Sequence, residues 1–241
     1  MRCKWNFFFF TRCWIGFWVG FLTACVSGPR LQTVVPLEEL FLRACLPGKN
    51  ISSVQGAAWL KVKTEEISGQ FFSHLVASVP TQLRLEVTNF LGGTEAILSI
   101  QENQYTILRG SDRQDWQGVN SWAGVPLRWI NELFLGRIPC PLSRTSYRLS
   151  RGLKGELVVD TNEKEAEKFI YSFKESRENP WPNALHWEKK ADMPFVLDFS
   201  FDDPEAETLS PTKWEVRSHK AWMKVRWKNR KISLTTTSYK N

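Results

Sequence analysis

The sequence lacks the short motifs that mark the common enzyme classes. It contains no Gly-x-Ser-x-Gly segment, no phosphate-binding P-loop and no Gly-x-Gly-x-x-Gly segment. Its three histidines, His74, His186 and His219, lie far apart and do not have the spacing of metal ligands or of a catalytic pair. These absences favour a binding or structural protein, and we expect no catalytic residue and no cofactor.

Cysteine is also scarce, and no Cys-x-x-Cys pair is present, so the sequence does not indicate a zinc or other metal site. Of the five cysteines, Cys3 and Cys13 lie in the first 24 residues and Cys25 follows directly. Cys45 and Cys140 remain, and two cysteines in an oxidising compartment can form one disulfide. Cys45 ends the first expected helix, and Cys140 follows the second expected helix and its proline. If the two helices line the same mouth of the fold, their ends meet and the Cα atoms lie within about 7 Å.

The first 24 residues contain no acidic side chain, unlike the rest of the chain. They begin with basic residues, continue through an apolar stretch at 14–22 and end in small residues, as a secretory signal does. The alternative is an uncleaved membrane anchor. However, Arg12 interrupts the apolar run, and the part after it is shorter than the ~20 residues that span a bilayer. The ending Leu22-Thr23-Ala24-Cys25 resembles the lipobox of bacterial lipoproteins. That resemblance implies cleavage before Cys25 and lipid attachment to its thiol.

Removal of residues 1–24 would leave 217 residues with a formal net charge of +4. This length suits one domain, so we expect a signal at 1–24, a lipidated tether at 25–35 and a single domain at 36–241. A modest positive charge suits an anionic lipid surface or a nucleic acid. Export argues against nucleic acid as a partner.

Hydrophobic periodicity predicts a β-rich domain with two helices. Helical spacing of apolar residues covers 36–45 and 125–135. Alternating apolar and polar residues predict strands at 52–63, 69–79, 82–88, 94–101, 104–109, 146–150, 155–160, 168–174, 184–190, 195–201, 213–219 and 221–228, the last leading into 231–237. We interpret the body as one long, strongly bent antiparallel sheet with one or two helices inserted in its hollow.

The segment Leu83 to Glu95 (LRLEVTNFLGGTE) has an apolar strand, then Asn-Phe-Leu-Gly, then another strand. Farther along, Gly124 to Leu127 and Trp129 to Gly136 form a proline-leucine helix that ends in Leu-Gly. Together with the lipobox, and in the same order, these segments resemble the LolB family of outer-membrane lipoprotein receptors. The resemblance covers residues 25 to about 140.

The resemblance to the LolB family implies a fold and a role. The fold is mainly β, an unclosed antiparallel β-barrel of about eleven strands with a helical lid. The role is that of a monomeric receptor, lipid-anchored on the periplasmic face of the outer membrane. It accepts acylated lipoproteins from a periplasmic carrier and inserts them into that membrane without covalent chemistry. Two alternatives stay open: a lipid- or glycolipid-binding lipoprotein on the same fold, and a structural envelope lipoprotein with a filled core.

A hollow half-barrel can shelter acyl chains, at roughly 0.8 kcal/mol for each buried CH₂. The candidates for its inward-facing ligand cavity are apolar strand residues and two residues of the lid. They are Leu60, Phe71, Leu75, Leu85, Leu98, Ile100, Tyr105 and Ile107, with Trp129 and Leu133 from the lid. For any single residue, an ordinary packed core is the alternative explanation.

Phe90 and Leu91 lie in a turn marked by Asn89 and two glycines, where polar residues are expected. In the LolB family the leucine of this motif projects and promotes membrane insertion, so the resemblance implies that role for Leu91. Phe90 stands where that family has proline. The alternative is that Phe90 and Leu91 fold back onto the sheet.

The segment 220–228 alternates, with Lys224, Arg226 and Lys228 on one face and apolar residues on the other. A barrel strand with a solvated basic face is the preferred interpretation. A patch that faces phospholipid is the alternative.

Overall fold

A computed structural model describes residues 35–65, 68–89, 91–110, 116–142, 146–162, 166–174, 181–190 and 195–235. The chain divides after Val35, and everything described below belongs to the unit that begins at Pro36. The expected signal peptide, the lipidation site Cys25 and nearly all of the expected tether lie outside the described residues.

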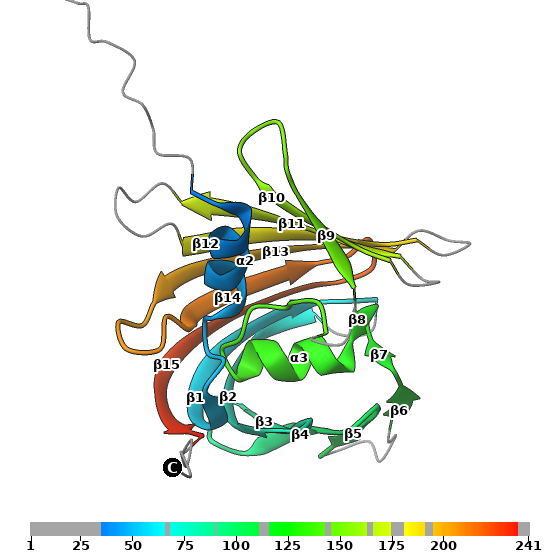
Figure 1. Ribbon diagram of the computed structural model, residues 1–241. Helices are drawn as coiled ribbons and strands as arrows, with labels where there is room; N and C mark the ends of the chain where they lie inside the picture. Colours follow the sequence, from blue (N-terminus) through cyan, green and yellow to red (C-terminus); the bar gives the residue numbers. More distant parts are fainter. Residues whose placement is uncertain are drawn as a thin grey trace, which may run out of the picture. The chain divides into compact units, whose positions relative to one another are not determined.

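The unit is built on one antiparallel sheet of thirteen strands in the order β6-β5-β4-β3-β2-β1-β15-β14-β13-β12-β11-β10-β9 (Figure 1). These strands are β1 (Ile51–Lys63), β2 (Ser68–Ser78), β3 (Gln82–Thr88), β4 (Thr94–Gln101), β5 (Gln104–Arg109), β6 (Trp116–Val119), β9 (Tyr147–Arg151), β10 (Leu157–Thr161), β11 (Glu167–Lys174), β12 (Trp181–Lys189), β13 (Phe195–Pro204), β14 (Pro211–Arg217) and β15 (Trp222–Leu234). The first strand pairs with the last, and β6 and β9 are the two free edges, so the sheet stays unclosed. A separate two-stranded sheet pairs β7 (Ser121–Trp122) with β8 (Val125–Pro126).

The two longest strands, β1 and β15, form the centre of the sheet and carry a bulge. The register of their pairing shifts between Ala57 and Ala58. The side-chain oxygen of Asn229 accepts the Ala57 N–H at 3.0 Å. A Cβ at Gly56 would collide with the backbone oxygen of Asn229, so only glycine fits this close approach. Bulges bend a strand and increase its twist. This bulge lies in the two central strands, where the sheet curls around the helices on its inner face.

Residues alternate between the two faces of the sheet along most strands. In β13, Leu197, Phe199 and Phe201 are buried, whereas Asp198 and Ser200 between them are exposed. The same alternation recurs in β3, β14 and β15. One face therefore lines an apolar interior and the other meets solvent, as the sequence pattern predicts.

The helices α2 (Leu37–Cys45) and α3 (Leu127–Phe134) lie on the inner face (Figure 1). Helix α3 is the better buried: Trp129 packs edge-on against Trp187, with ring centroids 4.3 Å apart. The helix ends in a Schellman motif, in which Gly136 has φ +75° and the Arg137 N–H bonds to the Glu132 carbonyl at 2.8 Å. The Schellman motif lets the chain turn sharply after α3 while it stays on the inner face of the sheet.

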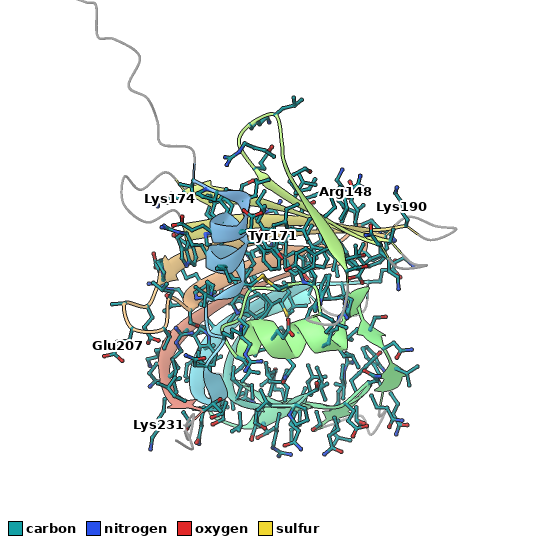
Figure 2. All side chains as sticks on the ribbon, in the orientation of Figure 1. Arg148, Tyr171, Lys174, Lys190, Glu207 and Lys231 are labelled. Atoms are coloured by element: carbon teal, nitrogen blue, oxygen red, sulfur yellow. A yellow bond between two sulfur atoms is a disulfide. The ribbon has the colours of Figure 1, made fainter. Side chains whose placement is uncertain are left out.

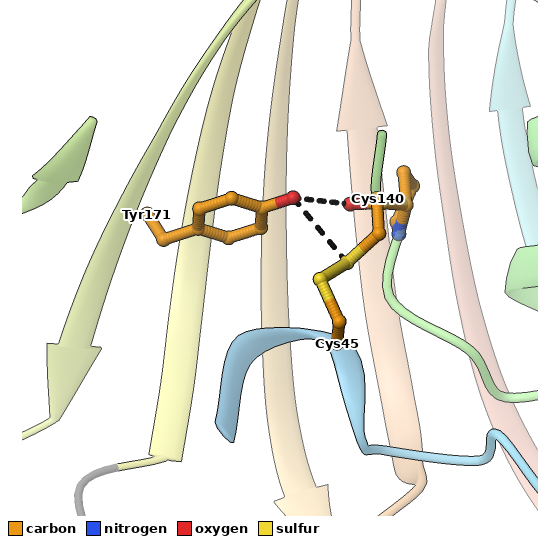
Figure 3. The surroundings of a disulfide bond; sticks show 4 residues. Cys45, Cys140 and Tyr171 are labelled. Carbon is orange, nitrogen blue, oxygen red and sulfur yellow. Dashed lines mark hydrogen bonds between the residues drawn. A yellow bond between two sulfur atoms is a disulfide. The ribbon is translucent and has the colours of Figure 1, made fainter. Parts of the chain in front are cut away.

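A disulfide joins Cys45, at the end of α2, to Cys140, with the two Cα atoms 5.9 Å apart (Figure 3). The buried Tyr171 hydroxyl donates to the Pro139 carbonyl at 2.8 Å and lies 3.4 Å from the Cys140 sulfur. Arg137 reinforces the junction, because its guanidinium donates to the backbone oxygens of Gly48, Lys49 and Ile51. The disulfide and the Arg137 hydrogen bonds therefore fix the segment after α3 to the segment after α2, and the Tyr171 hydrogen bond fixes it to β11.

The predicted fold class is confirmed: the unit is mainly β, with an unclosed antiparallel sheet and helices on the inner face of that sheet. The main sheet has thirteen strands, whereas the resemblance to the LolB family implies about eleven. The strands β6, β7 and β8 were not predicted from the sequence, since each is short and lacks a long apolar alternation. The second helix begins at Leu127 rather than at 125, because Val125 and Pro126 pair with the preceding strand.

Candidate functional site

A cavity of about 540 Å³, here called the hollow, lies between the inner face of the sheet and the end of α3. Strands β1 to β5 supply most of its wall, with β15 and α3 adding one residue each. The apolar lining comprises Leu60, Val62, Phe71, Leu85, Val87, Ala96, Leu98, Ile107, Trp122, Phe134 and Met223. The volume falls within the range of roughly 300–1,000 Å³ that is usual for small-molecule sites. An extended apolar group can therefore be sheltered here.

The polar residues of the hollow are gathered at one end. Asn89, Thr94, Glu95 and Arg109 all lie at or beside the ends of β3, β4 and β5 that adjoin the β3–β4 turn. The Arg109 guanidinium stacks over the Trp116 ring at 4.2 Å from its centroid. The hollow thus has apolar walls and a polar rim with one charge of each sign, which suits a ligand with an apolar chain and a polar head.

The turn between β3 and β4 presents Leu91 to solvent beside this rim. The side-chain oxygen of Asn89 accepts the N–H groups of Leu91 at 3.0 Å and Gly93 at 2.8 Å. Gly92 adopts φ +84°, a backbone conformation that a residue with a Cβ rarely adopts. Leu91 is 80% exposed, so it does not fold back onto the sheet. Phe90, the other predicted residue of this tip, lies outside the described residues.

The ten predicted cavity residues separate into two groups. Five line the hollow: Leu60, Phe71, Leu85, Leu98 and Ile107. Leu75, Ile100, Trp129 and Leu133 are fully buried away from it, and Tyr105 is half-buried next to Gly118. Helix α3 packs against β2 and β3 and so converts part of the inner face into ordinary core.

Helix α3 also carries a carboxyl group into the interior. Burial raises the pKa of Glu132 to about 7, although the nearby positive charges of Arg128 and Arg137 act to lower it. The neutral form of this carboxyl is therefore favoured more than it would be in water. A single buried acid without a nucleophile or a second acid does not form a hydrolytic site.

A second cavity, of about 790 Å³, lies where β11 to β15 meet the end of α2. Its lining is mixed. Arg43, Lys174 and Asp202 are charged, and Trp181 and Trp214 are aromatic. The Trp181 indole N–H already bonds to the Leu209 carbonyl at 3.0 Å. This cavity lacks the uniform apolar wall of the hollow.

The histidines do not assemble a reactive site. His186, on the outer face, bridges Asp198 at 2.7 Å and Glu188 at 2.9 Å. Partial burial acts to lower the pKa of His186, but these hydrogen bonds and the two negative charges outweigh it and raise the pKa above its ordinary value. Within the described ranges, no group of three or more His, Cys, Asp or Glu side chains could hold a metal ion.

Two residues of this region, Arg109 and Glu132, were not identified from the sequence. Asn89 was identified only as a turn residue, and its place at the polar rim, like that of Arg109, depends on how the strand ends lie in space. Glu132 stands in an apolar helix, and that position was the one available signal of its burial. Among the described residues, no helix has the length and apolar character needed to cross a membrane.

No protein-family model matches the chain, and no curated protein matches it. Solved structures do resemble it. A LolA superfamily protein from Nitrosomonas europaea is 8% identical and has a TM-score of 0.52, over 83% of this chain and 94% of that one. A DUF1329 family protein from Desulfovibrio piger is 9% identical and has a TM-score of 0.50, over 77% and 88% of the two chains. At such low identity the likeness establishes the fold alone, which is a LolA-like open barrel.

Proposed function

We propose that the hollow binds the acyl chains of a lipid or lipoprotein and that the β3–β4 tip passes this cargo to a membrane. The observation that carries the proposal is the position of the apolar hollow, whose polar rim adjoins the exposed Leu91. Each methylene buried in the hollow contributes roughly 0.8 kcal/mol. A cargo chain would thus be held by its length, without any covalent step.

The finer role is that of a LolB-like receptor, which takes acylated lipoproteins from a periplasmic carrier and places them in the outer membrane. The motifs around Leu91 and at 124–136 support it, as does the fold shared with a LolA superfamily protein. A lipid or glycolipid carrier on the same fold is the second candidate, because the hollow also suits free lipid. An open cavity of about 540 Å³ speaks against a purely structural protein with a filled core.

The proposed anchor is a lipid on Cys25, at the end of a segment that resembles a lipoprotein signal. A lipid on this residue would hold the protein at the periplasmic face of the outer membrane. One acyl chain binds a membrane only marginally, so the anchor needs more than one chain. The mass of the mature N-terminal peptide tests this proposal. An unmodified Cys25 with the signal still attached would contradict it.

The role of the tip is tested by Leu91→Glu. Entry of one leucine into lipid contributes on the order of 2 kcal/mol, enough to change a transfer rate about 30-fold. We expect the variant to bind a fluorescent acylated peptide as the wild type does but to transfer it to liposomes at least tenfold more slowly. Stopped-flow dequenching measures the transfer rate.

Leu153→Glu is the matched control for this experiment. Leu153 is 107% exposed at the tip of the β9–β10 hairpin, far from the hollow in the sheet order. Its replacement should leave transfer unchanged. If Leu91→Glu transfers cargo at the wild-type rate, or if both variants are equally slow, the β3–β4 tip has no specific role.

A further inference from the structure

Basic side chains gather on the outer face of the two central strands. Lys61 and Lys63 of β1 and Lys224, Arg226 and Lys228 of β15 are all exposed. Their positions are adjacent, because Lys61 pairs with Lys224 and the neighbouring pair is Trp59 with Arg226. These five cations with Trp59 and Phe72 are called the outer patch below.

The cations of the outer patch are poorly neutralised. Lys224 lies 3.5 Å from Glu215, which also pairs with Arg217. In the part of the chain that the structure describes, no salt bridge involves Lys61, Lys63, Arg226 or Lys228. A concentration of unpaired positive charge produces a field that attracts anions.

Aromatic rings stand among these charges. Trp59 is 45% exposed, and its ring contacts Phe72 edge-on with centroids 5.2 Å apart. The Lys228 ammonium lies 5.4 Å from the centroid of the Phe72 ring, and the Lys61 ammonium lies 5.3 Å from that of Trp222. Tryptophan is favoured at the boundary between lipid and water, where one part of the ring is apolar and the other is wet.

The outer patch continues toward the β3–β4 tip. Across the sheet, Arg226 pairs with Trp59, Trp59 with Phe72, and Phe72 with Thr88, the last residue of β3. Leu91 follows three residues later. One surface could therefore meet both the outer patch and the exposed leucine.

We propose that the outer patch rests on an anionic phospholipid surface. The cations that form no salt bridge can bind the phosphate headgroups, and the exposed Trp59 can lie at the boundary between lipid and water. Because β15 lies at the centre of the sheet, this contact is far from the free edges β6 and β9. The protein would lie with its back on the membrane, the unclosed side of its sheet turned away and its tip at the lipid surface. This inference extends the proposed function, but it depends on neither a lipid on Cys25 nor an occupied hollow.

The test measures binding of residues 36–241 to vesicles by co-sedimentation. This unit includes both cysteines of the disulfide and the whole described core, so it can fold alone, and it lacks Cys25. Vesicles of phosphatidylcholine with phosphatidylglycerol should bind it, and vesicles of phosphatidylcholine alone should bind it far more weakly. Because each basic residue near an anionic surface changes the binding constant about fivefold, the triple variant Lys61→Gln, Arg226→Gln, Lys228→Gln should bind about 100-fold more weakly.

A second triple variant, Arg148→Gln, Lys154→Gln, Lys190→Gln, removes the same charge elsewhere. Arg148 and Lys190 point outward from the other half of the sheet (Figure 2). This variant should keep binding within about threefold of the wild type. Equal losses in the two triple variants would overturn the proposal, since they would show a response to net charge alone. Equal binding to both vesicle types, or binding of an acidic protein but not of vesicles, would also overturn it.

The proposed function fails separately from this inference. The Lys61, Arg226 and Lys228 variant should bind a fluorescent fatty acid in the hollow as tightly as the wild type, because none of these residues lines it. Circular dichroism and the melting temperature check that the variant is folded, whether or not the hollow binds fatty acid.

Discussion

Ala96→Trp should weaken the binding of a fluorescent long-chain fatty acid by roughly 10- to 100-fold. Ala96 lines the hollow and lies opposite Val87 and Arg109 on the two neighbouring strands. An indole at this position occupies space that the acyl chain would fill. Exclusion of about two or three methylenes, at roughly 0.8 kcal/mol each, accounts for a loss of this size. A fluorescence titration measures the dissociation constant.

Leu108→Trp is the matched control, because it adds the same side chain on the opposite face. Leu108 belongs to the adjacent strand β5, is 41% exposed and does not line the hollow. Its variant should bind the fatty acid as the wild type does. Undiminished binding by a folded Ala96→Trp protein would show that the ligand binds elsewhere.

Removal of the disulfide should cause a large loss of stability. The double variant Cys45→Ser, Cys140→Ser opens a loop with a sequence separation of 95 residues. A native disulfide typically contributes about 2–4 kcal/mol, taken here as about 3 kcal/mol, partly by restricting the unfolded chain. For a domain of this size, the melting temperature should fall by about 6–12 °C. Calorimetry or thermal circular dichroism measures the change.

Reduction of the wild-type protein provides the internal control. A thiol reductant should lower its melting temperature to that of the double variant and leave the variant itself unaffected. The Tyr171 to Pro139 hydrogen bond and the Arg137 contacts remain in both forms, so the fold should persist below the transition. An unchanged melting temperature after complete reduction would show that the cross-link contributes nothing to stability.

The sheet was predictable because one face is buried and the other is wet. Alternation in β3 located Leu83 and Leu85 inside and Arg84 outside, as the structure has them. The edge strand β6 was missed, because its four residues are never fully buried and have no clear apolar face. Periodicity reports burial, so a short strand at a free edge gives little signal.

The hollow was predictable only in part. Periodicity shows which side chains face inward. It does not distinguish Leu98, which lines the open hollow, from Ile100, which is packed core. The difference depends on how the elements pack in three dimensions, which no local pattern contains. The turn at Leu91 was easier to predict, because an asparagine and two glycines mark it, but only the structure shows that Leu91 projects instead of folding back onto the sheet.

The central claim is that the hollow holds acyl chains, and native mass spectrometry of residues 36–241 tests it most directly. After incubation with an acylated peptide and a free lipid in excess, the spectrum should show one bound ligand per protein, released intact on activation. Preference for the acylated peptide would support the receptor role, and preference for free lipid would support the carrier. A spectrum of unliganded protein alone would contradict the account.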